Sequence, residues 1–216
     1  GAFMYVENNR KYFKKTIPKH FEIWITELGT YSMGSMNNTW LFGLYHAILI
    51  TKLATIPRVN IIIPYCLVCG ADSASLLTTN NGSIPYNPNS NLIWKQTVKG
   101  KIFSLITNVL YKKTDKLKVE YFGNQLRFDN IETIIGWKYR NQYLLLNTEH
   151  RYYELELNIN SNLINIYKIY PKHIEDVLNK SIGWEGLIET NQTHKVLFTN
   201  IILKIYPFEI CIITEL

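Results

Sequence analysis

The sequence predicts an α/β segment with a parallel sheet, followed by an antiparallel β-rich domain of the sandwich type. In the first half, apolar strand-like runs alternate with helical patterns in the order helix, strand, helix, strand, which is typical of a parallel sheet. After the charged turn at residues 112–116, the pattern changes to strand-sized pieces separated by Gly, Asn and charged turns. We therefore predict two domains, residues 1–115 and residues 116–216.

The N-terminal part predicts one helix and one buried strand. Residues 2–15 have apolar positions on one helical face, and Pro18 follows them and ends the helix. Residues 21–27, Phe-Glu-Ile-Trp-Ile-Thr-Glu, form a β-branched and aromatic run that predicts a buried parallel strand. The polar segment 29–38 then predicts a loop long enough to line a site.

A second helix and a second strand come next. Residues 39–54 have apolar side chains at intervals of three and four, which predicts one broad apolar face, and Asn37 or Asn38 is the expected N-cap. Residues 59–68 are almost continuously apolar and predict a strand buried on both faces.

The remaining elements complete the two predicted domains. Residues 70–88 are rich in Asn, Ser, Gly, Thr and Pro and predict a loop, whereas residues 98–111 have a helical pattern. The clearest strands predicted for the second domain are residues 117–121, 153–157 and 164–167 and the run 201–213.

Composition and charge exclude several classes of protein. The chain of 216 residues is 47% hydrophobic and 19% charged, which excludes disorder and predicts a substantial core. The net charge of +6 is scattered without a long basic run, so we predict no nucleic-acid partner. The apolar stretches are interrupted too often to span a bilayer, so no membrane association is expected. No signal peptide is visible, which leaves the cytoplasm as the default compartment.

The three cysteines predict neither a disulfide framework nor a metal site. Cys66 and Cys69 have C-x-x-C spacing, but a separation of three on a strand directs the two thiols to opposite faces. Together with Cys211 they read as buried, apolar-like cysteines. We expect no metal and no organic cofactor.

The motif Ile-Trp-Ile-Thr-Glu-Leu-Gly at residues 23–29, in this order of elements, resembles the C-terminal part of a retaining glycoside hydrolase of clan A, the clan of (β/α)8 barrels. The resemblance implies that this motif is barrel strand seven and that residues 59–68 are strand eight. The helices at residues 39–54 and 98–111 would be helices seven and eight, and residues 116–216 an appended β-sandwich. It covers nearly the whole chain, but only the strand-seven motif is specific at the level of residues.

The resemblance implies a catalytic role for Glu27. Retaining glycosidases use two carboxyl groups about 5–5.5 Å apart, one as the nucleophile and the other as acid/base. By its position in the motif, Glu27 matches the nucleophile. The alternative is an ordinary polar residue where a strand leaves the core.

Other site residues follow less directly. Tyr65, near the end of the second strand, and Tyr31, in the loop after Glu27, are candidate substrate-binding residues, with core or loop packing as the alternative for each. For His46, a place on the helix surface or between helices is favoured over a catalytic one. Asp72 reads as a turn residue rather than a ligand.

The chain departs from the family pattern in its acid/base residue and in its length. Members of the clan usually place the acid/base glutamate directly after an asparagine at the end of strand four, and this chain contains no Asn-Glu dipeptide. A complete barrel takes about 250 residues, whereas only about 111 precede the predicted sandwich, so strands one to six are missing. The acid/base residue is therefore expected outside this chain, in a second polypeptide or a missing N-terminal segment, and the chain alone is expected to be inactive toward a carbohydrate substrate. A different small fold that mimics the pattern is the third explanation.

The alternative function is a non-catalytic module in which the β-sandwich binds carbohydrate or protein. Tyrosines on its strands would supply stacking platforms if they were exposed together, whereas core and cross-strand packing explains them without a ligand. These tyrosines are Tyr139, Tyr143, Tyr152, Tyr153, Tyr167 and Tyr170.

Overall fold

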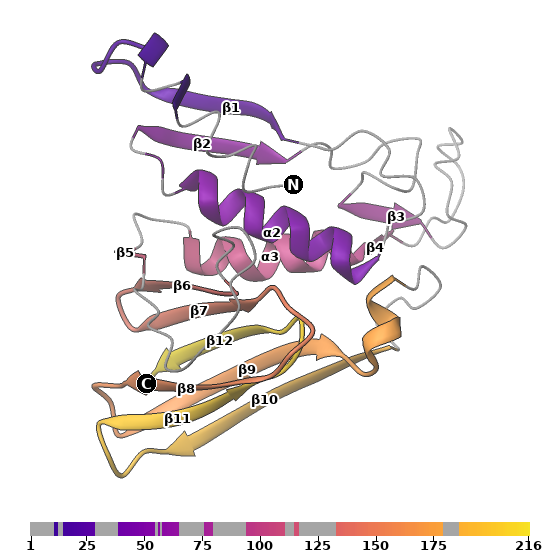
Figure 1. Ribbon diagram of the computed structural model, residues 1–216, viewed down its shortest axis with the longest axis vertical. Helices are drawn as coiled ribbons and strands as arrows, with labels where there is room; N and C mark the ends of the chain where they lie inside the picture. Colours follow the sequence, from indigo (N-terminus) through magenta and orange to yellow (C-terminus); the bar gives the residue numbers. More distant parts are fainter. Residues whose placement is uncertain are drawn as a thin grey trace. The chain divides into compact units, whose positions relative to one another are not determined.

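The computed structural model contains two compact units, which are described separately below (Figure 1). The first comprises Gly1–Ile106 with Leu178–Gly183, and the second comprises Thr107–Val177 with Trp184–Leu216. The structure describes residues 11–12, 15–28, 39–54, 56, 58–64, 76–79, 94–110, 115–116, 133–178 and 186–216.

The first unit is built around a pair of parallel strands, β1 (Ile23–Leu28) and β2 (Val59–Pro64). Helix α2 (Trp40–Ala54) lies between them in the sequence, as a parallel connection requires. The start of the pair is fixed by Arg58, whose backbone carbonyl accepts the amide of Ile23 at 2.8 Å. The Arg58 guanidinium also donates to the carbonyl oxygens of Pro18 and Phe21.

Helix α2 is buried on nearly all sides rather than along one face. Its buried residues include Gly43, His46 and Thr51 beside the large apolar side chains, as expected for a core helix. The Thr51 hydroxyl meets its hydrogen-bonding needs within the helix, at the Ala47 carbonyl 2.8 Å away. The N-cap is Thr39, whose Oγ1 accepts the amide of Phe42, and not the neighbouring asparagines.

Helix α3 (Val98–Leu110) packs against α2 and against the segment before β3 (Leu77–Thr79). At Gly43 of α2, an added Cβ would lie only 2.5 Å from the Ile102 side chain of α3. Thr97 caps α3, because its Oγ1 accepts the Gly100 amide at 3.0 Å and donates to the Leu76 carbonyl.

The second unit contains a six-stranded and a two-stranded sheet. The six-stranded sheet has the order β10-β9-β12-β7-β6-β5, and all its pairs are antiparallel. Strands β8 and β11 form the other sheet, also antiparallel. The bounds are β5 Asp115–Lys116, β6 Ile134–Tyr139, β7 Gln142–Asn147, β8 Tyr153–Asn158, β9 Leu163–Pro171, β10 Leu187–Lys195, β11 Asn200–Ile205 and β12 Ile210–Glu215.

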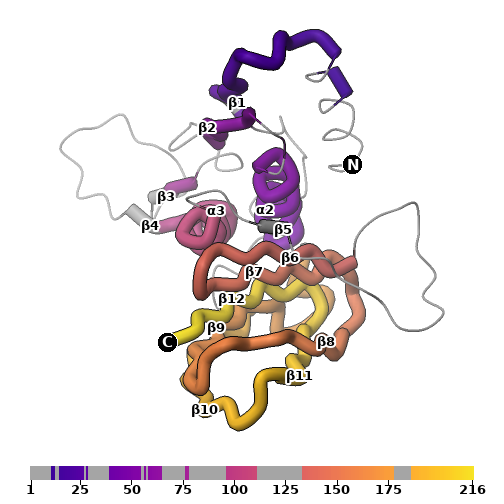
Figure 2. The backbone as a smooth tube through the Cα atoms, turned by 90° about the vertical axis from the view of Figure 1, so that its left-hand side faces the viewer, coloured from indigo at the N-terminus to yellow at the C-terminus, as the bar shows by residue number. Residues whose placement is uncertain are grey.

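The two sheets of the second unit, whose strands can be followed in Figure 2, share one apolar core. Ile134, Leu145 and Ile213 contribute to it from the six-stranded sheet, while Leu203 and Ile205 contribute from β11. These side chains recur at every second position of their strands, which is how a face-to-face pair of sheets builds its core.

The predicted mixture of helices with an antiparallel β-domain is confirmed, with two differences in detail. Part of the predicted loop 70–88 forms β3, which pairs with β4 (Trp94–Gln96). The run 201–213 is two strands, β11 and β12, separated by a turn in which Phe208 has a positive φ of 53°. The helix predicted at residues 2–15 and the strand at 117–121 lie largely or wholly outside the described residues.

Candidate functional site

Glu27 is the next-to-last residue of β1, at the C-terminal end of a strand that pairs in parallel with β2. The carboxyl ends of parallel strands are where α/β proteins place their sites. The other predicted members of the site, Tyr31 and Tyr65, lie outside the described residues, as does Asp72. Their grouping with Glu27 stays a prediction.

The backbone of β1 is irregular at the position of Glu27. Ile25 pairs with Ile62 and Leu28 with Pro64, so β1 has one more residue than β2 between these two pairs. Ile23 and Leu28 are both buried although an odd number of positions separates them. A strand that inserts one residue in this way changes which face the following residues use, and such bulges are frequent beside active sites. The sequence contained no signal for the bulge, because it depends on the register with β2.

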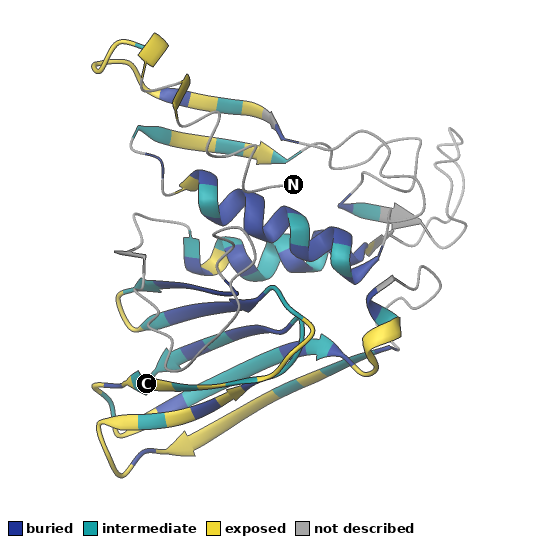
Figure 3. Ribbon diagram, viewed as in Figure 1, coloured by how far each residue is buried: buried dark blue, intermediate teal, exposed yellow. Residues whose placement is uncertain are grey.

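Exposed positions occur along both strands of the parallel pair (Figure 3), and several of them carry apolar side chains on one face. Trp24 is 60% exposed, its register partner Ile61 is 36% exposed, and Ile63 is 48% exposed. Parallel strands are normally buried on both faces. The prediction of a strand buried on both faces is therefore wrong for Val59–Pro64, the described part of residues 59–68. In the described part of the chain, the sheet also has only these two strands, so each strand has one unpaired edge.

A buried pair of basic residues lies between α2 and α3. His46 is 2% exposed and Lys99 is 3% exposed, and the Lys99 ammonium lies 5.9 Å from the centre of the Phe42 ring. His46 Nδ1 is 2.9 Å from the Phe42 carbonyl oxygen, while Nε2 has no hydrogen-bond partner. Burial and the charge of Lys99 lower the pKa of His46 to about 4, although the contact with the Phe42 carbonyl raises it. The predicted interhelix position of His46 is confirmed.

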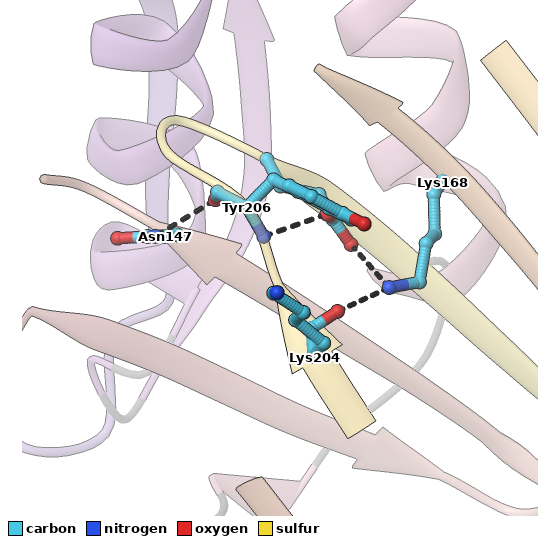
Figure 4. A network of polar contacts seen from close by, with 5 residues as sticks. Asn147, Lys168, Lys204 and Tyr206 are labelled. Carbon is cyan, nitrogen blue, oxygen red and sulfur yellow. Dashed lines mark hydrogen bonds and ion pairs between the residues drawn. The ribbon is translucent and has the colours of Figure 1, made fainter. Parts of the chain in front are cut away.

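The second unit contains a buried ion pair that the sequence did not predict (Figure 4). Glu209 is completely buried, and its Oε1 lies 3.4 Å from Lys168 Nζ. Its Oε2 accepts the backbone amide of Tyr206 at 2.8 Å. Lys168 also donates to the Lys204 carbonyl. Burial raises the pKa of Glu209 to about 7, although Lys168 opposes this shift. A lone glutamate between Phe208 and an apolar strand was the available signal.

The six tyrosines proposed as a stacking platform do not share one exposed face. Tyr143 is 1% exposed and donates to Glu215 Oε1 at 3.0 Å, whereas Tyr152 is 60% exposed. Tyr167 and Tyr170 belong to the same strand but, three positions apart, they occupy opposite faces. Core and cross-strand packing therefore accounts for most of these side chains.

The described residues offer neither a metal-binding cluster nor a membrane-spanning helix. No three His, Cys, Asp or Glu side chains lie close enough together there to hold a metal ion. Within the same ranges, no helix has both the length and the apolar character that crossing a membrane requires. Cys211 is buried, as predicted, while Cys66 and Cys69 lie outside the described residues.

Several solved structures that are similar to this chain are glycoside hydrolases. The GH51 arabinofuranosidase from Xanthomonas axonopodis pv. citri matches with a TM-score of 0.66 at 10% identity, over 98% of this chain and 44% of its own. A GH30 endoxylanase from Clostridium papyrosolvens matches with a TM-score of 0.54 at 10% identity, over 90% of this chain and 42% of its own. A β-porphyranase of glycoside hydrolase family 86 from Bacteroides plebeius matches with a TM-score of 0.53 at 15% identity, over 98% of this chain and 37% of its own.

The matched structures are much longer than this chain, which spans less than half the length of each. At these identities the likeness shows the fold alone, which is that of part of a glycoside hydrolase. No protein-family model matches the sequence. No curated protein matches it either.

Proposed function

We propose that this chain is the C-terminal portion of a retaining glycoside hydrolase, with Glu27 as the nucleophile. One observation carries the proposal: a Thr-Glu pair lies at the C-terminal end of a parallel strand, one residue before its last, within a fold that matches part of three glycoside hydrolases. In this proposal residues 1–115 are the last part of a (β/α)8 barrel, with β1 and β2 as strands seven and eight. Residues 116–216 are the appended sandwich.

The chemistry of retention explains why a carboxylate is needed at such a position. The nucleophile attacks the anomeric carbon from one face of the sugar, while an acid on the other side protonates the leaving oxygen. A rigid strand end holds the carboxylate ready for the oxocarbenium-like transition state. A residue with this role must leave the face covered by helices, and the bulge at Thr26–Glu27 supports such a change of face.

The acid/base carboxyl is proposed to come from outside this chain, on the missing strands. The exposed apolar face around Trp24, Ile61 and Ile63 and the unpaired edges of β1 and β2 support a barrel that another segment completes. That segment is either the preceding part of a longer polypeptide or a second chain. The substrate is a carbohydrate with an O-glycosidic bond.

The test is covalent trapping in a reconstituted enzyme. The chain is co-expressed with the polypeptide encoded directly upstream and treated with an activated fluoroglycoside or a cyclophellitol-type probe. We expect labelling of Glu27 that is lost in Glu27→Gln, and no labelling of the chain alone. The matched control is Glu22→Gln, which replaces an exposed glutamate of the same segment and should label normally. Labelling of another residue, or of none in the assembled protein, would reject the assignment.

The second candidate function is a binding module in the β-domain, which the tyrosines alone do not support. A different feature of that domain, the groove between β10 and β11, does favour a ligand.

A further inference from the structure

The open side of the sandwich forms a groove of about 590 Å³ that is lined by β9, β10, β11 and the turn between β10 and β11. This volume lies within the range of small-molecule sites. All of its lining residues belong to the second unit. The groove exists because, in the described part of the chain, the two-stranded sheet ends at β11 and leaves the inner side of β10 uncovered.

The floor of the groove is polar although it is the core-facing side of the sheet. Gln192 pairs with Ile166 and His194 pairs with Ile164, and these two isoleucines pack in the core of the sandwich. Directly paired residues share a face of a sheet, so Gln192 and His194 also face inward. Both are nevertheless exposed. A layer of apolar side chains over them would leave their polar groups without water or partners.

The wall of the groove is apolar and exposed. Leu197 and Phe198 are each 78% exposed in the turn between β10 and β11, and Ile201 on the inner side of β11 continues the lining. At the other end, the rings of Tyr170 and Tyr206 stack with their centres 4.4 Å apart and their planes 9° apart. The groove therefore combines a row of hydrogen-bonding side chains with apolar and aromatic surfaces.

The charge of the groove is positive. Its lining includes the two lysines Lys168 and Lys195, and none of the described lining residues is Asp or Glu. The Lys168 ammonium is paired with Glu209. Lys195 is exposed and pairs with Leu163, on the other face of β10 from His194, but β10 is an edge strand and Lys195 still lines the groove. A ligand with negative charge suits this lining better than a neutral one.

We propose that this groove binds an acidic oligosaccharide, with sugar hydroxyls on Gln192 and His194, the apolar faces of the sugar rings on Leu197 and Phe198, and a uronate carboxylate at Lys195. Sugars present both hydroxyl groups and apolar C–H faces, which matches the two kinds of surface in the groove. The choice of a saccharide over other polar anions rests on the proposed glycoside hydrolase function. The shape and the charge of the groove are observed independently of that proposed function.

Binding is measured by titration calorimetry on the intact chain, with oligogalacturonate and glucuronoxylan fragments as acidic probes and xylo-oligosaccharides of equal length as neutral probes. We expect at least one acidic probe to bind and the neutral probes to bind at least tenfold more weakly, by roughly the contribution of one charge-assisted contact. Lys195→Glu and Phe198→Ala should each weaken binding by about tenfold. The matched controls are Lys172→Glu and Ile174→Ala, which change exposed residues outside the groove lining and should bind as the unmodified chain does.

Three results would overturn the proposal: no acidic probe binds, the neutral probes bind equally well, or the groove variants bind as tightly as their controls.

Sedimentation at several concentrations tests another occupant, a second copy of this chain. Self-association that Phe198→Ala abolishes would assign the groove to a protein contact and also overturn the proposal. The titrations are repeated with Glu27→Gln, which should bind unchanged. Failure of the proposed hydrolytic role of Glu27 can therefore be distinguished from failure of the proposed binding by the groove.

Discussion

Lys168 Nζ lies 3.4 Å from Glu209 Oε1, and the Glu209 carboxyl has no exposure to solvent. The pKa of Glu209 is raised from 4.5 to about 7, mainly by burial. The folded chain therefore binds more protons at this site than the unfolded chain between these two values. The stability that this site contributes is fully present below pH 4.5 and is lost as the pH rises toward 7.

Replacing Lys168 with Met should destabilise the β-domain in a pH-dependent way. At pH 8 the variant leaves a buried carboxylate without its cation, which costs about 3–5 kcal/mol. At pH 5 the carboxyl of the variant is protonated, so the loss should be clearly smaller. Urea unfolding at both pH values measures the difference, with exposed Lys172→Met as the control. Equal losses at the two pH values would contradict the assigned role of Glu209.

His46 should give the first unit a pH dependence of the opposite sign. Its pKa is lowered from 6.5 to about 4, so between these values the unfolded chain binds more protons. The contribution is fully present above pH 6.5 and is lost as the pH falls toward 4, and its size is about 3 kcal/mol. In the His46→Leu variant the free energy of unfolding should no longer fall between pH 6.5 and pH 4 for this reason, since leucine carries no titrating group.

The change of the unfolding free energy with pH is measured by urea unfolding at several pH values. The unfolding is followed by far-ultraviolet circular dichroism, which reports the helices. At pH 7, His46→Leu should stay within about 1 kcal/mol of the unmodified chain, since it removes an acceptor that has no partner. His20→Gln replaces an exposed histidine of the same unit and should keep the slope. A slope that survives in His46→Leu would show that another group titrates.

The sequence predicted those elements that local patterns determine. Helices α2 and α3 follow from intervals of three and four between apolar residues, and β1 and β2 from continuous β-branched runs. Strand β3 was missed because three residues within a polar stretch carry no periodic signal. The bulge beside Glu27 and the burial of Lys99 depend on residues distant in the sequence, which no local pattern reveals. For Glu209 the sequence offered one local signal, its position between Phe208 and an apolar strand, but its partner Lys168 lies on another strand.

Two glycines on facing parts of the helical unit should respond differently to alanine. At Gly43 the added Cβ meets the flexible end of Ile102, whereas at Gly100 it meets the backbone carbonyl group of Leu76. Alanine gains about 1 kcal/mol of helix propensity at either site. We expect Gly43→Ala to stay within about 1 kcal/mol of the unmodified chain and Gly100→Ala to lose about 1–3 kcal/mol. Thermal unfolding of the two variants checks this order, and the reverse order would refute the close approach at Leu76.

The exposed face of the parallel pair should matter for assembly and not for the stability of the chain alone. Trp24 is 60% exposed on this face, so Trp24→Asp should change the free energy of unfolding of the isolated chain by less than about 0.5 kcal/mol. In the proposed barrel the same position would become interior, where an unpaired charge is strongly unfavourable. Co-purification with the upstream polypeptide, and covalent labelling of the complex, should both be lost.

The control for this prediction is Ile174→Asp, which places the same charge at an exposed apolar residue of the second unit. It should leave co-purification and labelling intact, because Ile174 takes no part in the proposed barrel. If Trp24→Asp assembles as well as Ile174→Asp does, the face around Trp24 and Ile61 does not join the missing strands. The barrel would then have to be completed through the free edges of β1 and β2 alone, which a charge on this face would not disturb.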